Sequence, residues 1–174
     1  IDTDLNSVSR FTWKSIPITD EHCPRDTALE AVLNPYKLEA EKKYSRVITR
    51  LKRRLTHPSR DQETELGGFL ADILQESLRL DMMLVGSGSI RVTELGPIVL
   101  FSDLTECIPY DDAAIALWVK GAQLKKMILY MLRDEVWDGS HCEFFQFSEG
   151  VQIIYDKQSH SLKEFSLHGE PIED

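Results

Sequence analysis

The sequence predicts an α+β fold in which a mixed sheet is flanked by helices. Two segments, 64–80 and 121–135, carry apolar residues at helical spacing. Several short apolar runs bounded by Gly, Pro or polar turns lie between and after them and are typical of strands. Helices and strands follow one another without strict βαβ alternation, which favours α+β over a parallel α/β sheet. With 174 residues, 42% of them hydrophobic, the chain can bury one sizeable core.

The first 58 residues read as a connector that contains a linker helix. Residues 1–25 carry Pro17 and Pro24 and predict an irregular arm. Asp26 is a suitable N-cap for a short helix over 26–33, which Asn34-Pro35 is expected to interrupt.

A second helix is predicted over 36–55, since apolar residues recur there at helical spacing between basic ones. Its basic face suits solvent or a partner surface. The break at 56–59 places the boundary of the compact domain, residues 59–174, after Pro58.

The helix predicted over 64–80 begins the compact domain, with Thr64 or Asp61 as its N-cap. Its apolar stripe consists of Leu66, Phe69, Leu70, Ile73, Leu74 and Leu78. Gly67 and Gly68 lie in its first turns, where each costs about 1 kcal/mol relative to Ala. Two such costs in succession predict a close approach of backbone or ligand.

The remaining elements are expected in the order strand, glycine-rich loop, strand, strand, helix and antiparallel meander. The strands are predicted at 82–85, 97–102 and 113–120, and the helix at 121–135. The meander is predicted from three further strands, at 144–147, 151–156 and 162–167, with a polar turn at 156–161.

Charge and cysteine usage exclude several functions. Lys and Arg number 20 against 29 Asp and Glu, so the net charge of −9 disfavours nucleic-acid binding. No apolar run is long enough for a membrane span. The three cysteines, Cys23, Cys107 and Cys142, form no metal knuckle or disulfide framework and favour a reducing compartment. The five histidines lack metal-site spacing, and the adjacent His141 and Cys142 lack a third, orienting group for thiol catalysis.

The loop GSGSIR at 86–91 suggests a dinucleotide fingerprint, yet Arg91 stands where a small residue is needed and extended chain follows instead of a helix. No GK[ST] follows, which excludes an NTPase phosphate loop. Two interpretations remain. The amides of the turn and the Arg91 guanidinium could hold an anionic or polar ligand, or the turn could be purely structural, with Arg91 in a surface ion pair.

Two other residues raise the same choice between function and structure. Arg60 precedes the positive end of the helix at 64–80, which is unfavourable for its charge unless a ligand or an acidic neighbour compensates it. Tyr110 follows Pro109 in a loop. Its ring either packs in the core or is presented to a planar ligand.

The order of these segments resembles the C-terminal domain of the 5'-nucleotidase family of two-domain metallophosphoesterases. The resemblance covers about residues 60–170 and is carried by RDQETELGGFLADIL (60–74), LVGSGSIR (84–91), GPIVLFSDLTECIPY (96–110), ALWVKGAQLKKMIL (116–129) and SEGVQIIYD (148–156). Residues 1–55 look like the connector from the family's N-terminal domain.

In that family the N-terminal domain binds two divalent metal ions and cleaves phosphate esters, and the C-terminal domain grips the nucleoside. The metal-binding signatures of the N-terminal domain do not occur in this sequence, so the chain is expected to need no cofactor of its own and to be inactive alone. The resemblance implies that Arg60 and Arg91 contact a nucleotide-like phosphate ester, that Gly88 lets the loop approach it, and that Tyr110 stacks on the base.

The sequence departs from the family pattern at three places. Gly86 and Glu65 replace asparagines, and the family's last segment, with a second stacking aromatic, is expected beyond Asp174. An exposed sheet edge could then support a dimer. The alternative to substrate recognition is a protein-interaction or regulatory module that kept the fold.

Overall fold

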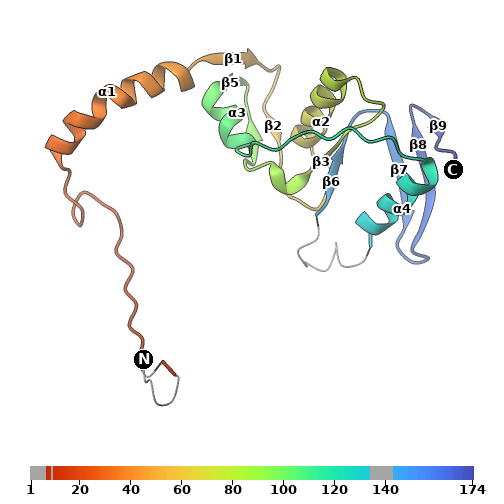
Figure 1. Ribbon diagram of the computed structural model, residues 1–174, viewed down its shortest axis with the longest axis horizontal. Helices are drawn as coiled ribbons and strands as arrows, with labels where there is room; N and C mark the ends of the chain where they lie inside the picture. Colours follow the sequence, from red (N-terminus) through yellow and green to blue (C-terminus); the bar gives the residue numbers. More distant parts are fainter. Residues whose placement is uncertain (1–6, 9, 134–142) are drawn as a thin grey trace. The chain divides into compact units, whose positions relative to one another are not determined.

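The computed structural model describes residues 7–8, 10–133 and 143–174, and its contacts divide the chain into two compact units, 1–42 and 43–174 (Figure 1). His141 and Cys142 lie outside the described residues.

The first unit contains most of helix α1 (Thr27–Tyr44), in which no residue is buried. Asp26 caps it as predicted, because its Oδ1 accepts the N–H of Leu29 at 3.0 Å. The interruption expected at Asn34-Pro35 is wrong, since Pro35 lies inside the helix. A proline removes one backbone hydrogen bond, and the good helix formers on both sides keep the remaining ones.

The helix predicted over 36–55 is also wrong beyond Tyr44. Strand β1 (Val47–Arg50) pairs antiparallel with β5 (Ile98–Leu100), and β2 (Leu55–Thr56) pairs with β4 (Glu94–Leu95). The β-branched run Val-Ile-Thr at 47–49 favours extended backbone, and pairing with distant strands outweighs the helical spacing. The second unit therefore starts at Lys43, earlier than the boundary expected after Pro58.

Helix α2 (Glu65–Leu78) confirms the main helix prediction and positions the site. Thr64 is its N-cap, and its face packs against β3 (Leu84–Gly86), β6 (Phe145–Phe147) and β2. One core cluster lies beneath it and consists of Leu66, Leu70, Ile90, Leu95, Val99 and Cys107.

The segment after β5 differs from the prediction in two ways. The strand expected over 97–102 ends at Leu100, where helix α3 (Phe101–Cys107) begins, and Asp103 Oδ2 accepts the Leu100 N–H at 2.7 Å. The strand expected over 113–120 is wrong among the described residues: the segment runs as an unpaired extended chain between α3 and α4 (Figure 1). An apolar segment becomes a strand only when a neighbour supplies its hydrogen bonds.

The C-terminal part forms a second core around helix α4 (Gly121–Met131). Strands β7 (Val151–Asp156), β8 (Ser161–Leu167) and β9 (Glu170–Pro171) form an antiparallel meander, in which the predicted polar turn joins β7 to β8. Hydrogen bonds from the side chain of Ser159 and the amide of Gln158 lower the pKa of Asp156 in this turn to about 2. The strand at 145–147 was expected in the meander but pairs with β3 and packs against α2.

The α+β class is confirmed. The described strands form four small sheets with antiparallel pairings throughout, rather than the one mixed sheet that the sequence predicts. Among the described residues, no helix is long and apolar enough to cross a membrane.

Candidate functional site

A buried polar network joins the start of α2 to the glycine loop. Gln146 of β6 is 1% exposed; its Nε2 donates to Gln62 O at 2.8 Å and to Ser87 Oγ at 2.5 Å. Its Oε1 accepts the Thr64 N–H at 2.9 Å. Both ends of this amide are therefore satisfied, as a buried polar group requires.

His57 completes the network and is 4% exposed. Its Nε2 lies 3.2 Å from the carbonyl oxygen of Ser87, and its Nδ1 lies 2.8 Å from Thr64 Oγ1. Because a carbonyl only accepts, Nε2 carries the proton and Nδ1 accepts from the hydroxyl. Burial lowers the pKa of His57, and the charge of Arg60 lowers it further, whereas the bond to Ser87 raises it. His57 is thus a neutral linker between the glycine loop and α2.

The two glycines of α2 have different roles. A Cβ on Gly67 would overlap the side chain of Gln146, so any larger residue would have to displace this buried side chain. A Cβ on Gly68 would meet only Phe147 O, at 4.0 Å. A close approach therefore exists at Gly67, but the approaching group is the side chain of Gln146 and not the backbone or ligand that was expected.

Arg60, Gly88 and Arg91 meet at one turn. Residues Ser87–Ser89 form a single 3-10 turn, in which Gly88 O accepts from Arg91 Nη1 at 3.2 Å. Arg60 Nη2 occupies the space that a Cβ on Gly88 would need. Three of the four predicted site residues are therefore adjacent. We call this group of Arg60, Gly88 and Arg91 the arginine turn.

Glu143 also belongs to this place and was missed from the sequence. Its Oε1 accepts the Gly88 N–H at 2.6 Å, and its Oε2 lies 3.8 Å from Arg60 Nη2. The Arg60 and Glu143 side chains are 60% and 42% exposed, so both charges face solvent. No sequence motif signals Glu143, because it lies more than 50 positions from the loop that it contacts.

Tyr110, the fourth predicted residue, is 48% exposed. The N–H of Arg91 donates to Cys107 O at 2.9 Å, so the chain leaves α3 beside the arginine turn. Three residues span at most about 10 Å, which keeps Tyr110 in the neighbourhood. Within the described part of the chain, no contact joins its ring to the two arginines.

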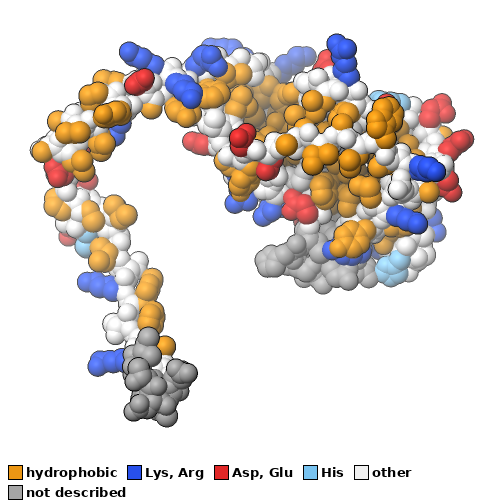
Figure 2. Space-filling model, viewed as in Figure 1, with side chains coloured by type: hydrophobic (Ala, Val, Ile, Leu, Met, Phe, Trp, Pro, Cys, Tyr) orange, Lys and Arg blue, Asp and Glu red, His pale blue; other side chains and the backbone are white. Residues whose placement is uncertain are grey.

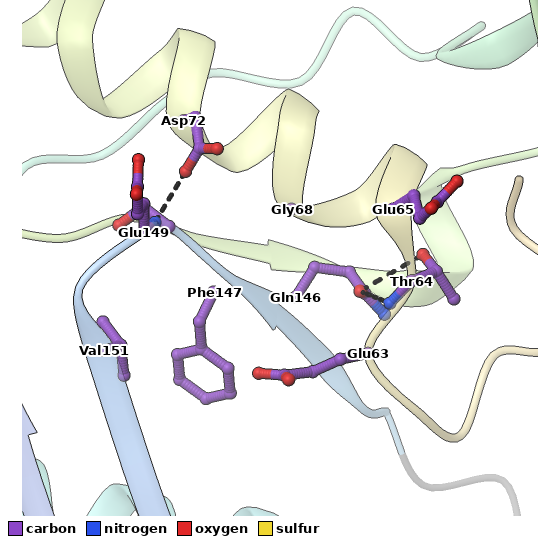
Figure 3. Close-up of a pocket in the computed structure, with 10 residues that line it drawn as sticks. Glu63, Thr64, Glu65, Gly68, Asp72, Gln146, Phe147, Glu149 and Val151 are labelled. Atoms are coloured by element: carbon purple, nitrogen blue, oxygen red, sulfur yellow. Dashed lines mark hydrogen bonds between the residues drawn. The ribbon is translucent and has the colours of Figure 1, made fainter. Parts of the chain in front are cut away.

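A pocket of about 360 Å³ lies along α2 and is lined by four carboxylates, Glu63, Glu65, Asp72 and Glu149 (Figure 3). Asp72 Oδ1 accepts the Glu149 N–H at 2.6 Å and holds the turn after β6 against the helix. The pocket shares Thr64 and Gln146 with the buried network. The negative lining of this pocket disfavours a phosphate.

Among the described residues, no group of three or more His, Cys, Asp or Glu side chains could hold a metal ion. Cys107 is fully buried, and burial raises the pKa of its thiol to about 11, which makes it a poor nucleophile.

The fold defines a small α+β domain whose glycine loop gathers charged side chains at one turn. Residues 40–174 match the 5'-nucleotidase, C-terminal domain family, and the chain belongs to this family. The resemblance inferred from the sequence is thereby confirmed.

The chain is similar in fold to the crystal structure of a 5'-nucleotidase precursor from Thermus thermophilus. The TM-score is 0.63 at 18% identity, over 88% of this chain and 32% of that one. It is also 25% identical over 130 residues to endonuclease YhcR of Bacillus subtilis (strain 168), covering 74% of this chain and 11% of that protein. The chain thus spans about a third or less of the length of these relatives.

Proposed function

We propose that this chain is the substrate-recognition domain of a 5'-nucleotidase-like metallophosphoesterase and binds a nucleotide-like phosphate ester. The observation that carries the proposal is the arginine turn, where two guanidinium groups meet at one glycine. Guanidinium groups match phosphate oxygens in geometry and charge, and the nearby Tyr110 supplies a ring for a base. Gly86 has no side chain with which to hold the ligand, in contrast to the asparagine that the family resemblance implies there.

Catalysis in this proposal belongs to an N-terminal domain that would hold two divalent metal ions. The part played by Arg60, Arg91 and Tyr110 is to orient the ester so that its phosphate reaches that centre. The isolated chain should release no phosphate from AMP in the presence of Mg²⁺, Mn²⁺ or Zn²⁺. Metal-dependent release that a substitution in this chain abolishes would contradict the division of roles.

Nuclear magnetic resonance titration of the full chain with AMP tests the binding step. Shifts should concentrate at Arg60, at 86–91 and around Tyr110, with a Kd on the order of millimolar because the arginine turn is open to solvent. Arg91→Ala should remove the shifts. Arg54→Ala is the matched control, since Arg54 pairs with Glu94 elsewhere on the surface. Unchanged spectra at high AMP, or equal effects of the two variants, would contradict the proposal.

A second candidate function, a protein-interaction module, is favoured by the exposed segment 113–119. Ile115, Leu117 and Trp118 are 75%, 70% and 100% exposed. Figure 2 shows hydrophobic side chains gathered across the same face of the second unit. An apolar extended chain without a paired neighbour is suited to strand addition.

The occupant that fits this segment best is a second copy of it. Antiparallel pairing about a two-fold axis at Ala116 would set Ile115 opposite Leu117, the small Ala114 opposite Trp118, and Asp112 opposite Lys120. Each copy would then supply one partner of every pair, and each of these pairs, including the ion pair at the ends, would occur twice.

Analytical ultracentrifugation measures this association. The chain should dimerise with concentration, and Leu117→Lys should make it monomeric, whereas Tyr130→Lys, at another exposed apolar residue, should not. A chain that stays monomeric at all concentrations would contradict pairing with a second copy. The partner of segment 113–119 would then have to be an extended segment of another protein.

A further inference from the structure

Glu143 occupies a place shaped for a carboxylate in the arginine turn. A Cβ on Gly86 would lie 2.9 Å from its Oε1, and a Cβ on Gly88 would lie 2.9 Å from both of its oxygens. Any side chain at either position would therefore crowd the carboxylate. The glycines of this loop make room for Glu143 and Arg60, whereas the family resemblance implied that Gly88 makes room for a ligand.

Glu143 retains capacity to bind a further group. A carboxylate has about four lone-pair positions and only accepts hydrogen bonds. One of them is used by the Gly88 N–H, and Oε2 stands 3.8 Å from Arg60, too far for a hydrogen bond. Because the Glu143 side chain is 42% exposed, Oε2 can accept from a ligand.

Arg60 and Glu143 together impose opposite demands on a ligand. The guanidinium only donates and favours an anion, whereas the adjacent carboxylate repels an anion and favours a donor. A bare phosphate satisfies one of these groups and is repelled by the other. A sugar phosphate satisfies both, with its phosphate at the arginines and a hydroxyl at Glu143.

We infer that Glu143 is a specificity-determining residue that accepts a hydrogen bond from a sugar hydroxyl and so selects hydroxylated phosphate esters over bare anions. This inference rests on the proposed function, because it assigns the parts of one ligand to neighbouring side chains. It adds an acceptor to a site that otherwise consists of cations and a ring.

A thermodynamic cycle of two ligands and two proteins tests the inference. The full chain and its Glu143→Gln variant are titrated with AMP and with 2',3'-dideoxy-AMP, with chemical shifts as the readout. The wild type should bind AMP roughly tenfold more tightly than the dideoxy compound, the ratio expected for one hydrogen bond to a charged group. In Glu143→Gln the ratio should fall to about twofold, because an amide oxygen accepts without charge assistance.

Inorganic phosphate supplies the opposite readout. Glu143→Gln should bind it more tightly than the wild type does, by roughly three- to tenfold, since a neighbouring negative charge has been removed. Glu63→Gln removes a carboxylate from the acidic pocket instead and should leave all these ratios unchanged.

The outcomes separate the inference from the proposed function. If AMP binds at the arginine turn but the wild type does not distinguish it from the dideoxy compound, the role of Glu143 is overturned and the proposed function stands. If no nucleotide binds the wild type, the proposed function itself fails. The comparison of AMP with dideoxy-AMP needs only the wild-type chain, so a variant that failed to fold would not prevent the test.

Discussion

Helices α1 and α2 both begin with a side-chain N-cap, but they differ in burial and in the contacts of that cap. Asp26 accepts the Leu29 N–H at 3.0 Å, and Thr64 accepts the Gly67 N–H at 3.1 Å. No residue of α1 is buried, whereas α2 buries Leu66, Gly67, Leu70 and Ala71. Thr64 is also bonded to His57 through its hydroxyl and to Gln146 through its backbone N–H, whereas no described contact joins Asp26 to a distant segment.

A capping signal therefore predicts where a helix starts, but it does not predict how much the cap contributes to the stability of the fold. Removal of a cap on an exposed helix affects that helix alone. Removal of a cap that is part of a buried network leaves other polar groups without partners, and each of those adds its own cost. Substitutions in α2 should therefore lower the stability of the whole second unit.

The largest effect is expected at Gly67. Gly67→Ala should lower the free energy of unfolding by about 3 kcal/mol, because its methyl group would overlap the buried side chain of Gln146. Gly68→Ala is the matched control one position away. It should be neutral or stabilising by up to about 1 kcal/mol, since alanine favours the helix and finds space there. Urea denaturation measures both, and equal losses would contradict the assignment of the close approach to Gly67.

The two caps provide the next comparison. Thr64→Ala should destabilise the second unit by about 2 kcal/mol, through loss of the cap and of a partner for His57. Asp26→Ala should leave the urea midpoint of the second unit unchanged and reduce only the helical circular dichroism signal. A large change of the midpoint in Asp26→Ala would show that α1 contributes to that core.

Acidification should weaken α2 through His57. Its pKa is lowered in the folded chain, chiefly by burial, so the unfolded chain binds the extra proton first. Stability should therefore be constant well above the ordinary histidine value of 6.5 and should fall as the pH drops below it. Urea midpoints between about pH 8 and pH 5 measure the slope. His57→Gln should have a lower midpoint and a smaller slope, and an unchanged slope would assign the dependence to other groups.

The smallest effect is expected for removal of residues 1–42. This deletion takes away the first unit and no strand, so the remainder should unfold cooperatively with its urea midpoint nearly unchanged. A deletion of residues 1–56 should be much more harmful, because it also removes β1 and β2 with Leu51 and Leu55, which pack on the core of α2. Equal behaviour of the two deletions would contradict the start of the second unit at Lys43.

Local sequence patterns predicted part of the fold. They failed where the secondary structure depends on hydrogen-bond partners from distant segments. The stripe over 64–80 predicted α2 because burial on one face follows directly from helical periodicity. The apolar residues at 47, 48, 51 and 55 also have helical spacing, but they lie in and around β1 and β2, since distant β5 and β4 supply their hydrogen bonds. For 113–120 the reverse holds: a strand-like sequence finds no partner among the described strands.

The candidate site divides in the same way. A glycine loop that ends in Arg91 and a misplaced charge at Arg60 are visible in the sequence, because each conflicts with a local rule. No local sequence rule is broken at Gln146, His57 or Glu143. Their importance arises only from the groups that they contact, and those groups lie 7 to 84 positions away in the chain.

The sequence by itself determined the α+β class, the existence and cap of α2, the hairpin at 151–167 and the residues of the arginine turn. These depend on spacing, on capping chemistry and on the backbone freedom of glycine, all of which act within a few residues. Only the tertiary structure decided that residues 47–56 are strands, that Gly67 makes room for Gln146, and that Glu143 stands between Arg60 and Gly88. The physical reason is that hydrogen-bond partners and burial for these groups come from distant segments, and chain folding alone brings them together.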